Sequence, residues 1–224
     1  MDIGFLGPWI PLILEAIGLT LVLSAASLVG AGVIGLAVAI ARVLGGRLVS
    51  APLGVVVDLI RGTPLLVQML IWFLAPAKLG LSLDPVPAAI LALSVNGGAF
   101  LSEIIRGALG GVPKGQREAA TAIGLGRVYT LRAILLPQAM PVIVPSAISF
   151  YIGLVKDTSI AYILGVHELL RTSQLVTMQE FHPMEIYTVA AAIYFVICFP
   201  LSRLALHLEA RMRRSGMVQE RLAV

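Results

Sequence analysis

Four adjacent polar residues near the end of an apolar segment form the first candidate site: Lys156, Asp157, Thr158 and Ser159. A zwitterionic amino acid needs a cation for its carboxylate and an anion for its ammonium group, because charge-assisted hydrogen bonds are the strong ones. The two hydroxyl groups would add short hydrogen-bonding partners. A solvated loop at a membrane surface would show the same residue types, so both interpretations stay open on spacing alone.

Neutral polar side chains in two other apolar segments form a second candidate site. Gln68, Ser94 and Asn96 lie near the middle of their segments. Uncharged donors and acceptors suit a solute that binds weakly and leaves again. Such groups also join helices inside a membrane, at about 0.6 kcal/mol each. We therefore expect Gln68 and Asn96 either to contact a solute or to hold neighbouring helices together.

Two opposite charges, Arg61 and Glu103, occur at similar depth in these same two segments. A charge at the centre of a bilayer costs about 2.5–3.5 kcal/mol on insertion scales, so it usually faces a partner or a cavity. We predict a structural ion pair between Arg61 and Glu103. Direct contact with a solute is the alternative.

Catalytic, metal-binding and cofactor-binding residues are not expected. Cys198 is the only cysteine, and the three histidines are scattered without metal-ligand spacing. The sequence shows no persuasive pairing of a nucleophile with a base and no G-x4-G-K-[ST] phosphate-binding loop. We predict that the chain is not an enzyme and that ATP, if used, is bound by a partner.

The composition indicates an integral membrane protein. Hydrophobic residues make up 58% of the 224 residues and charged residues 12%, with a mean hydropathy of +0.97. Soluble domains are about a quarter charged, and a membrane-spanning helix needs about 20 apolar residues. We predict a single all-α membrane domain over residues 1–224. Its five expected spans are 16–41, 52–74, 86–105, 134–154 and 186–206.

Basic residues cluster after the first, third and fifth expected spans, while the opposite connections are mainly acidic. By the positive-inside rule, the N-terminus is predicted outside and the C-terminus in the cytoplasm. The sequence pI of about 9.6 then reflects topology rather than nucleic-acid binding. The basic clusters are Arg42 and Arg47; Arg106, Lys114, Arg117, Arg127 and Arg132; and Arg211, Arg213, Arg214 and Arg221. The opposite side holds Lys78 and Arg171 with Asp2, Asp84, Glu168, Glu180 and Glu185.

The fourth span contains three prolines at four-residue spacing, Pro137, Pro141 and Pro145. Each removes a backbone hydrogen bond and bends a helix. Irregular helix in a membrane is tolerated where protein or a water-lined cavity satisfies the freed carbonyl groups. We therefore expect this span to line a pathway.

The connection at about 112–132 is unusually polar for this chain. Residues 116–123 are rich in alanine and predict a short helix, which Gly124 and Gly126 would end. Such a helix could be presented to a soluble partner, although an ordinary interhelical loop is equally consistent with the pattern.

This connection resembles the loop signature of permease subunits of ABC importers. The matching spacing is EAA-x3-G-x9-I-x-L-P, formed by Glu118, Ala119, Ala120, Gly124, Ile134, Leu136 and Pro137. The resemblance implies the type I importer permease fold, in which this loop forms a coupling helix. It also implies that Glu118, Ala119, Ala120 and Gly124 dock on an ATP-binding subunit.

Three further stretches resemble the polar-amino-acid branch of these permeases: RGTPLLVQ from Arg61, AFLSEIIRG from Ala99, and LVKDTS from Leu154. This resemblance implies that residues 156–159 lie beside an amino-acid pocket. Phe100 stands where the branch commonly has tyrosine. The implied partners are two ATP-binding subunits, a second permease subunit that is identical or paralogous, and an external solute-binding protein. The implied location is the bacterial inner membrane.

The leading hypothesis is thus the membrane subunit of an ATP-driven amino-acid importer. A first alternative is an ABC importer permease for another small organic solute. An ion-coupled secondary carrier is a second, although carriers usually show internal repeats and more spans. An intramembrane enzyme is a third, and it lacks recognisable catalytic groups.

Overall fold

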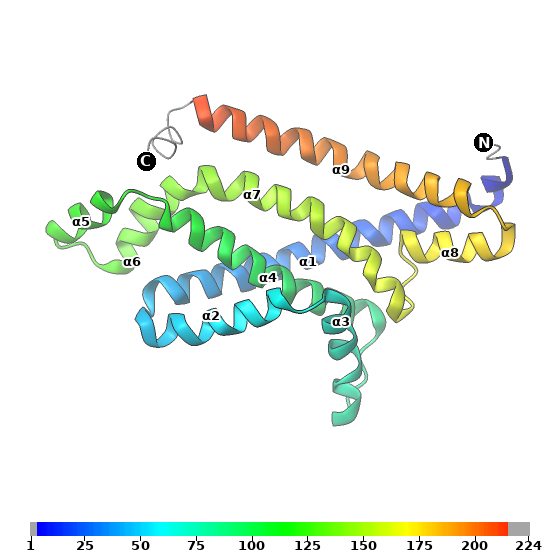
Figure 1. The fold of residues 1–224 in the computed structure, drawn as a ribbon, viewed down its shortest axis with the longest axis horizontal. Helices are drawn as coiled ribbons and strands as arrows, with labels where there is room; N and C mark the ends of the chain where they lie inside the picture. Colours follow the sequence, from blue (N-terminus) through cyan, green and yellow to red (C-terminus); the bar gives the residue numbers. More distant parts are fainter. Residues whose placement is uncertain (1–3, 215–224) are drawn as a thin grey trace.

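The computed structural model describes residues 4–214, and these residues form helices and connecting turns without strands (Figure 1). Asp2 and Arg221, used above for the topology prediction, lie outside the described residues. The α-helices are α1 (Ile10–Leu44), α2 (Gly46–Gly62), α3 (Leu65–Leu74), α4 (Pro85–Gly110), α5 (Lys114–Ala122), α6 (Arg127–Thr130), α7 (Leu136–Asp157), α8 (Leu169–Glu180) and α9 (Pro183–Arg214). Shorter 3-10 or π turns are η1 (Gly4–Trp9), η2 (Pro76–Leu79), η3 (Leu131–Leu135) and η4 (Thr158–Leu164).

Four apolar helical stretches are long enough to cross a membrane, and a bent pair can supply a fifth span. The four are Gly4–Leu44, Pro85–Gly110, Arg127–Leu164 and Pro183–Met212. The fold class predicted from the sequence, an all-α membrane protein with five spans, agrees with this arrangement. The bent pair replaces the predicted second span.

The prediction of one continuous span over residues 52–74 was wrong. α2 and α3 meet at an angle of 104°, with the break at Thr63 and Pro64. Proline lacks the N–H that a helix interior needs, and its ring forces the preceding residue into an extended conformation. Thr63 has φ −108° and ψ 145° accordingly. The Pro64 signal was present in the sequence and is sufficient to explain the break.

The centre of the bundle is the contact between α1 and α4, which is the most extensive between any two helices described. Glycine makes this close approach possible. A Cβ atom built on Gly98 of α4 would lie 2.7 Å from the Cβ of Ile34 on α1, and one on Gly30 would lie 2.7 Å from the Cβ of Ser94. Membrane helices associate through such small residues, because van der Waals packing replaces the hydrophobic effect as the driving force.

A π turn precedes the proline-containing helix α7. Pro137 lies in the first turn of α7, and its ring would crowd the carbonyl group of Ala133, which belongs to η3. A π turn widens the helix locally, so it accommodates this crowding. Pro141 and Pro145 lie inside α7, and Pro145 is buried. The three prolines therefore sit in helix that packs against α4 and α9.

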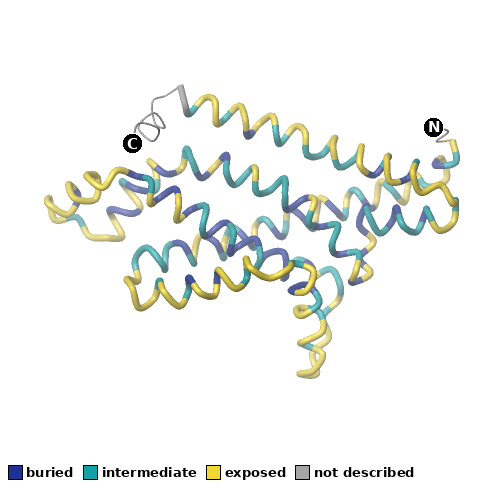
Figure 2. Tube along the Cα trace, viewed as in Figure 1, coloured by how far each residue is buried: buried dark blue, intermediate teal, exposed yellow. Residues whose placement is uncertain are grey.

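Helix α9 packs on α7 and α8, and exposed residues run along much of its remaining surface (Figure 2). Only 11% of its most apolar window is buried within the subunit. An apolar, exposed helix of this length suits contact with lipid or with another membrane helix. α9 ends beside the α5 end of the molecule, opposite to η1 (Figure 1).

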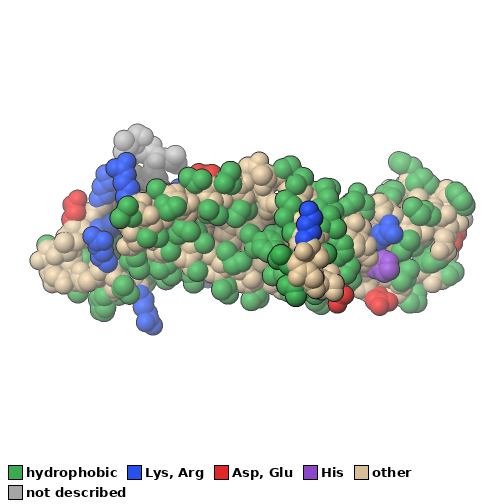
Figure 3. Space-filling view, turned by 90° about the horizontal axis from the view of Figure 1, so that it is seen from below, with side chains coloured by type: hydrophobic (Ala, Val, Ile, Leu, Met, Phe, Trp, Pro, Cys, Tyr) green, Lys and Arg blue, Asp and Glu red, His purple; other side chains and the backbone are tan. Residues whose placement is uncertain are grey.

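Basic side chains are unevenly distributed along the molecule. Lys and Arg side chains are most numerous at the end that holds α5 and α6, whereas the other end shows histidine, acidic side chains and fewer basic ones (Figure 3). This second end carries a cavity of about 770 Å³ whose lining includes Glu15, Asp84 and His167. The distribution has the polarity that the positive-inside rule requires.

The α1–α4 contact predicts opposite effects for two glycines of the same helix. Gly98→Ala forces a Cβ atom against Ile34 and should destabilise the protein by about 1–3 kcal/mol. Gly107→Ala meets no atom within 4 Å and should be neutral or stabilising, since alanine favours helix over glycine. Unfolding in mixed detergent micelles measures both, and equal stability of the two variants would contradict this account of the interface.

Candidate functional site

The break between α2 and α3 is held by one buried amide. Nε2 of Gln68 donates to the backbone carbonyl groups of Ile60 and Thr63, at 2.6 and 3.0 Å, and to the Thr63 hydroxyl at 2.8 Å. Gln68 is only 8% exposed. The carbonyl groups at a broken helix need donors, because water does not reach them in a membrane. Gln68 supplies these donors.

Asn96 of α4 joins this network from the neighbouring helix. Its Nδ2 donates to Oε1 of Gln68 at 3.2 Å. The structure therefore brings together two residues that the sequence placed 28 positions apart, and it supports the helix-joining alternative for the Gln68 amide. Asn96 is half-buried, and its side-chain oxygen makes no hydrogen bond within residues 4–214.

The stretch 156–159 is helical rather than a loop. Lys156 and Asp157 close α7, and Thr158 opens η4. Lys156 is exposed, Asp157 and Ser159 are half-buried, and Thr158 is fully buried with its hydroxyl donating to the Val155 carbonyl at 2.7 Å. The Thr158 hydroxyl is thus already hydrogen-bonded to the backbone, whereas Lys156, Asp157 and Ser159 keep polar groups accessible.

One apolar cluster connects the helices that carry this stretch and the Gln68–Asn96 pair. Met69, Leu93, Leu154 and Ala161 are all buried in it, and they come from α3, α4, α7 and η4 respectively. Each is at most three residues from a candidate polar residue, and η4 packs directly on α3 and α4. The polar candidates are therefore held on rigid helices that share one core.

Arg61 lies on α2 just before the break and faces an aromatic pair. Its guanidinium carbon is 5.2 Å from the ring centre of Phe100, which in turn stacks with Phe150 at 6.3 Å. A cation over an aromatic face is stabilised by about 0.5–1 kcal/mol when exposed. The guanidinium also approaches Asp58 at 4.0 Å, and Asp58 is largely exposed.

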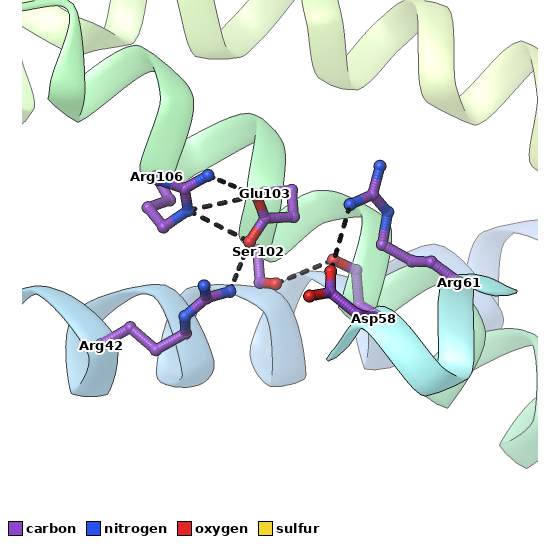
Figure 4. Close-up of polar contacts among 7 residues, drawn as sticks. Arg42, Asp58, Arg61, Ser102, Glu103 and Arg106 are labelled. Atoms are coloured by element: carbon purple, nitrogen blue, oxygen red, sulfur yellow. Dashed lines mark hydrogen bonds and ion pairs between the residues drawn. The ribbon is translucent and has the colours of Figure 1, made fainter. Parts of the chain in front are cut away.

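The predicted ion pair between Arg61 and Glu103 was wrong. Glu103 instead bridges two other arginines (Figure 4): Arg42 of α1 contacts its Oε1, and Arg106 contacts its Oε2 at 2.6 Å. No contact joins Arg61 to Glu103 among residues 4–214. Matched depth along two helices does not specify which faces meet, and here the buried face of α4 turns Glu103 toward α1.

The segment before α6 adopts the helix expected from its sequence. α5 spans Lys114–Ala122, and Gly124 follows it with φ +78°, the left-handed conformation that ends helices. The N–H of Leu125 donates to the Ala120 carbonyl across this turn. Gly126, with φ −66°, does not take part in this way and instead precedes α6.

The docking residues predicted on α5 divide into two groups. Glu118, Ala119 and Gly124 are exposed, whereas Ala120 is 2% exposed and faces the subunit. A small residue at position 120 lets α5 lie close to the rest of the protein. Of the four predicted docking residues, only the first three are therefore accessible to a partner.

Sequence reasoning missed a polar contact centred on Glu168. Its buried carboxylate accepts the N–H groups of Leu170 and Arg171, capping α8, and accepts the Tyr194 hydroxyl at 3.0 Å. Burial raises the pKa of Glu168, and these three hydrogen bonds oppose that rise. The glutamate immediately before a helical segment was the available signal, since acidic side chains are favourable at the positive end of the helix dipole.

The sequence of this chain is similar to those of known transport proteins. Residues 31–214 match the family described as binding-protein-dependent transport system inner membrane component. The chain is 38% identical over 214 residues to the glutamine transport system permease protein of Escherichia coli (strain K12), covering 95% of this chain and 98% of that protein. It is 40% identical over 205 residues to the L-cystine transport system permease protein of Bacillus subtilis (strain 168), covering 91% and 88%.

Solved structures share the fold. The crystal structure of an amino acid ABC transporter with histidines matches with a TM-score of 0.86 and 28% identity, over 94% of this chain and 99% of that chain. An inward-facing MetNI methionine ABC transporter matches with a TM-score of 0.72 and 22% identity, over 90% and 98%, and shows the fold alone.

The chain belongs to the family of inner-membrane permease components of binding-protein-dependent transport systems. The predicted class, the permease subunit of an ABC importer of the polar-amino-acid type, is confirmed by these matches. The alternatives of a secondary carrier and of an intramembrane enzyme are therefore set aside.

The contacts of Glu103 predict a coupling that a double-mutant cycle can measure. Glu103→Ala leaves the largely buried Arg42 guanidinium and the exposed Arg106 guanidinium without their anion and should cost about 3 kcal/mol of unfolding free energy. Combined with Arg42→Ala, the loss should be smaller than the sum of the single losses by about 0.5–3 kcal/mol.

The control is Glu103→Ala combined with Arg61→Ala, which should be additive within about 0.5 kcal/mol, because these side chains share no contact. Coupling of Glu103 to Arg61 but not to Arg42 would show that the pairing described here is incorrect.

Proposed function

We propose that the protein translocates a polar amino acid, delivered by an external solute-binding protein and driven by ATP hydrolysis on separate subunits. The observation that carries the proposal is the accessible Lys156–Asp157 pair at a helix end that shares an apolar core with the helices of Gln68 and Asn96. The named relatives, a glutamine and an L-cystine transport permease, support this substrate class.

In this proposal the site recognises the groups common to all amino acids. Lys156 attracts the carboxylate, and Asp157 accepts hydrogen bonds from the ammonium group. The Ser159 hydroxyl and the free oxygen of Asn96 add neutral contacts. Gln68 and Thr158, whose donors are engaged with the backbone, act by positioning the α2–α3 break and the start of η4. Affinity stays modest, since the site must release what it binds.

The proposed assembly contains two permease subunits, identical or paralogous, and two ATP-binding subunits. The basic end with α5 lies in the cytoplasm and the end with η1 and α8 lies outside, as the charge distribution favours. Glu118, Ala119 and Gly124 contact the ATP-binding subunit, and Ala120 seats α5 on its own subunit. The chain itself binds no ATP or other cofactor.

The substrate assignment is tested by Asp157→Asn, which keeps the shape of the side chain and removes its charge. Uptake of labelled polar amino acids into proteoliposomes holding all subunits should fall about tenfold or more, the loss expected for one charge-assisted hydrogen bond. Basal ATP hydrolysis and subunit assembly should persist. The matched control is Glu209→Gln, an exposed carboxylate on α9, which should transport normally. Unchanged uptake across an amino-acid panel by Asp157→Asn would rule out this site.

The docking assignment is tested by two glycines on either side of Leu125. Gly124→Val places a β-branched residue at φ +78°, which strains the backbone by about 1–3 kcal/mol and should displace the end of α5. Gly126→Val occupies an ordinary extended conformation with open space and is the control. We expect Gly124→Val alone to lose ATP-driven uptake while remaining folded in the membrane. Normal uptake by Gly124→Val would contradict the docking role of this turn.

A further inference from the structure

A second cavity lies beneath α5, away from the candidate amino-acid site. Its volume is about 230 Å³, and it is lined by the last turn of α1, by α5 and α6, and by η3. The residues that matter for its chemistry are Val43, Leu44, Leu131, Arg117, Thr121 and Arg127.

The lining of this cavity is divided between apolar and basic side chains. Val43, Leu44 and Leu131 form the apolar part, while Arg117 and Arg127 place two guanidinium groups at its edge. No carboxylate is found among the described residues that line it. The cavity therefore favours a ligand with an anionic group joined to an apolar group.

One of the two arginines is fixed and the other is available. Arg117 donates to the carbonyl of Leu109 at 2.9 Å, which anchors its side chain at the end of α4. Arg127 is exposed, and its guanidinium has no hydrogen-bond or ion-pair partner within residues 4–214. An exposed guanidinium beside an anchored one can form the second half of an anion clamp.

The cavity also lies where the membrane-spanning part of α1 ends. The span predicted from the sequence ends at residue 41, three residues before Leu44, which lines the cavity. Beside Arg127, the short helix α6 exposes Val128 and Tyr129, which are 65% and 61% accessible. Tyrosine and basic residues are typical of the boundary between the membrane and water. We therefore infer that the cavity lies at headgroup level.

We propose that this cavity binds the headgroup of an anionic phospholipid. Arg127 and Arg117 contact the phosphate, and the first acyl carbons lie against Val43 and Leu44. Basic pockets between membrane helices on the cytoplasmic side are suited to such headgroups. A bound lipid would join the end of α1 to α6 and to the proposed docking helix α5, in the cytoplasmic leaflet of the membrane.

The test measures lipid retention and does not depend on transport. The full complex is placed in nanodiscs containing equal amounts of phosphatidylglycerol and phosphatidylcholine, then released into mild detergent, and retained lipid is counted by native mass spectrometry. The wild type should retain phosphatidylglycerol in preference. Arg127→Gln should retain about fivefold less, the factor that corresponds to about 1 kcal/mol per basic residue at an anionic surface.

The matched control is Arg132→Gln, which removes an exposed arginine outside the cavity and should retain lipid like the wild type. A second variant, Arg127→Glu, should abolish the preference by repulsion, and thermal unfolding confirms that all variants are folded. Equal retention by the wild type and Arg127→Gln overturns the proposal.

Two other results also overturn it. Loss of phosphatidylglycerol on adding glycerol phosphate or inorganic phosphate would indicate a site for free phosphate. Loss of the ATP-binding subunit from Arg127→Gln, with lipid retention unchanged, would indicate a protein contact instead. Because amino-acid uptake is not the readout, failure here is distinct from failure of the proposed transport function.

Discussion

The close packing of α1 against α4 is the contact on which the positions of the other helices depend. Glycines such as Gly30 and Gly98 bring the two backbones together, and no hydrophobic effect is available in lipid to replace that fit. α4 then serves as the surface for α3 and α7, while α1 holds α2 and α8. Arg42 of α1 forms an ion pair with Glu103 of α4 across the same interface. The ion pair and the close helix packing therefore stabilise the same contact.

Polar groups inside the bundle fall into two classes: those with hydrogen-bond or ion-pair partners within the subunit, and those that remain accessible. Gln68 and Glu103 have partners on adjoining helices or at the α2–α3 break, which removes the cost of burying them. Lys156, Asp157 and the oxygen of Asn96 remain accessible. Uncompensated polar groups at membrane depth are costly, and they persist where a cavity or a transient ligand meets them. This difference separates the framework from the candidate amino-acid contacts.

The position of α5 connects the helices that carry these polar groups to the proposed ATP-binding subunit. In the chain, α5 follows α4, which carries Asn96. It is followed by α6, η3 and α7, and α7 carries Lys156 near its end. A displacement of α5 by a docked ATP-binding subunit would therefore act on both helices that hold the candidate site. Rigid helices transmit such a displacement, since their packed faces have few alternative arrangements. The cavity at Arg127 is lined by the end of α1, by α5 and by α6, so the proposed lipid would contact all three elements.

Local features were determined by the sequence alone. A long apolar run predicts a membrane span from residues that are adjacent in the chain. The helix α5 likewise follows from the helix propensity of alanine, and its end at Gly124 follows from the freedom of glycine at positive φ. The α2–α3 break was readable at Pro64 in the same way. The partners of Glu103 and Gln68 and the accessibility of Lys156 were decided only by the tertiary structure. Those outcomes depend on how far each helix is rotated about its axis, and that rotation is set by packing between residues distant in the chain.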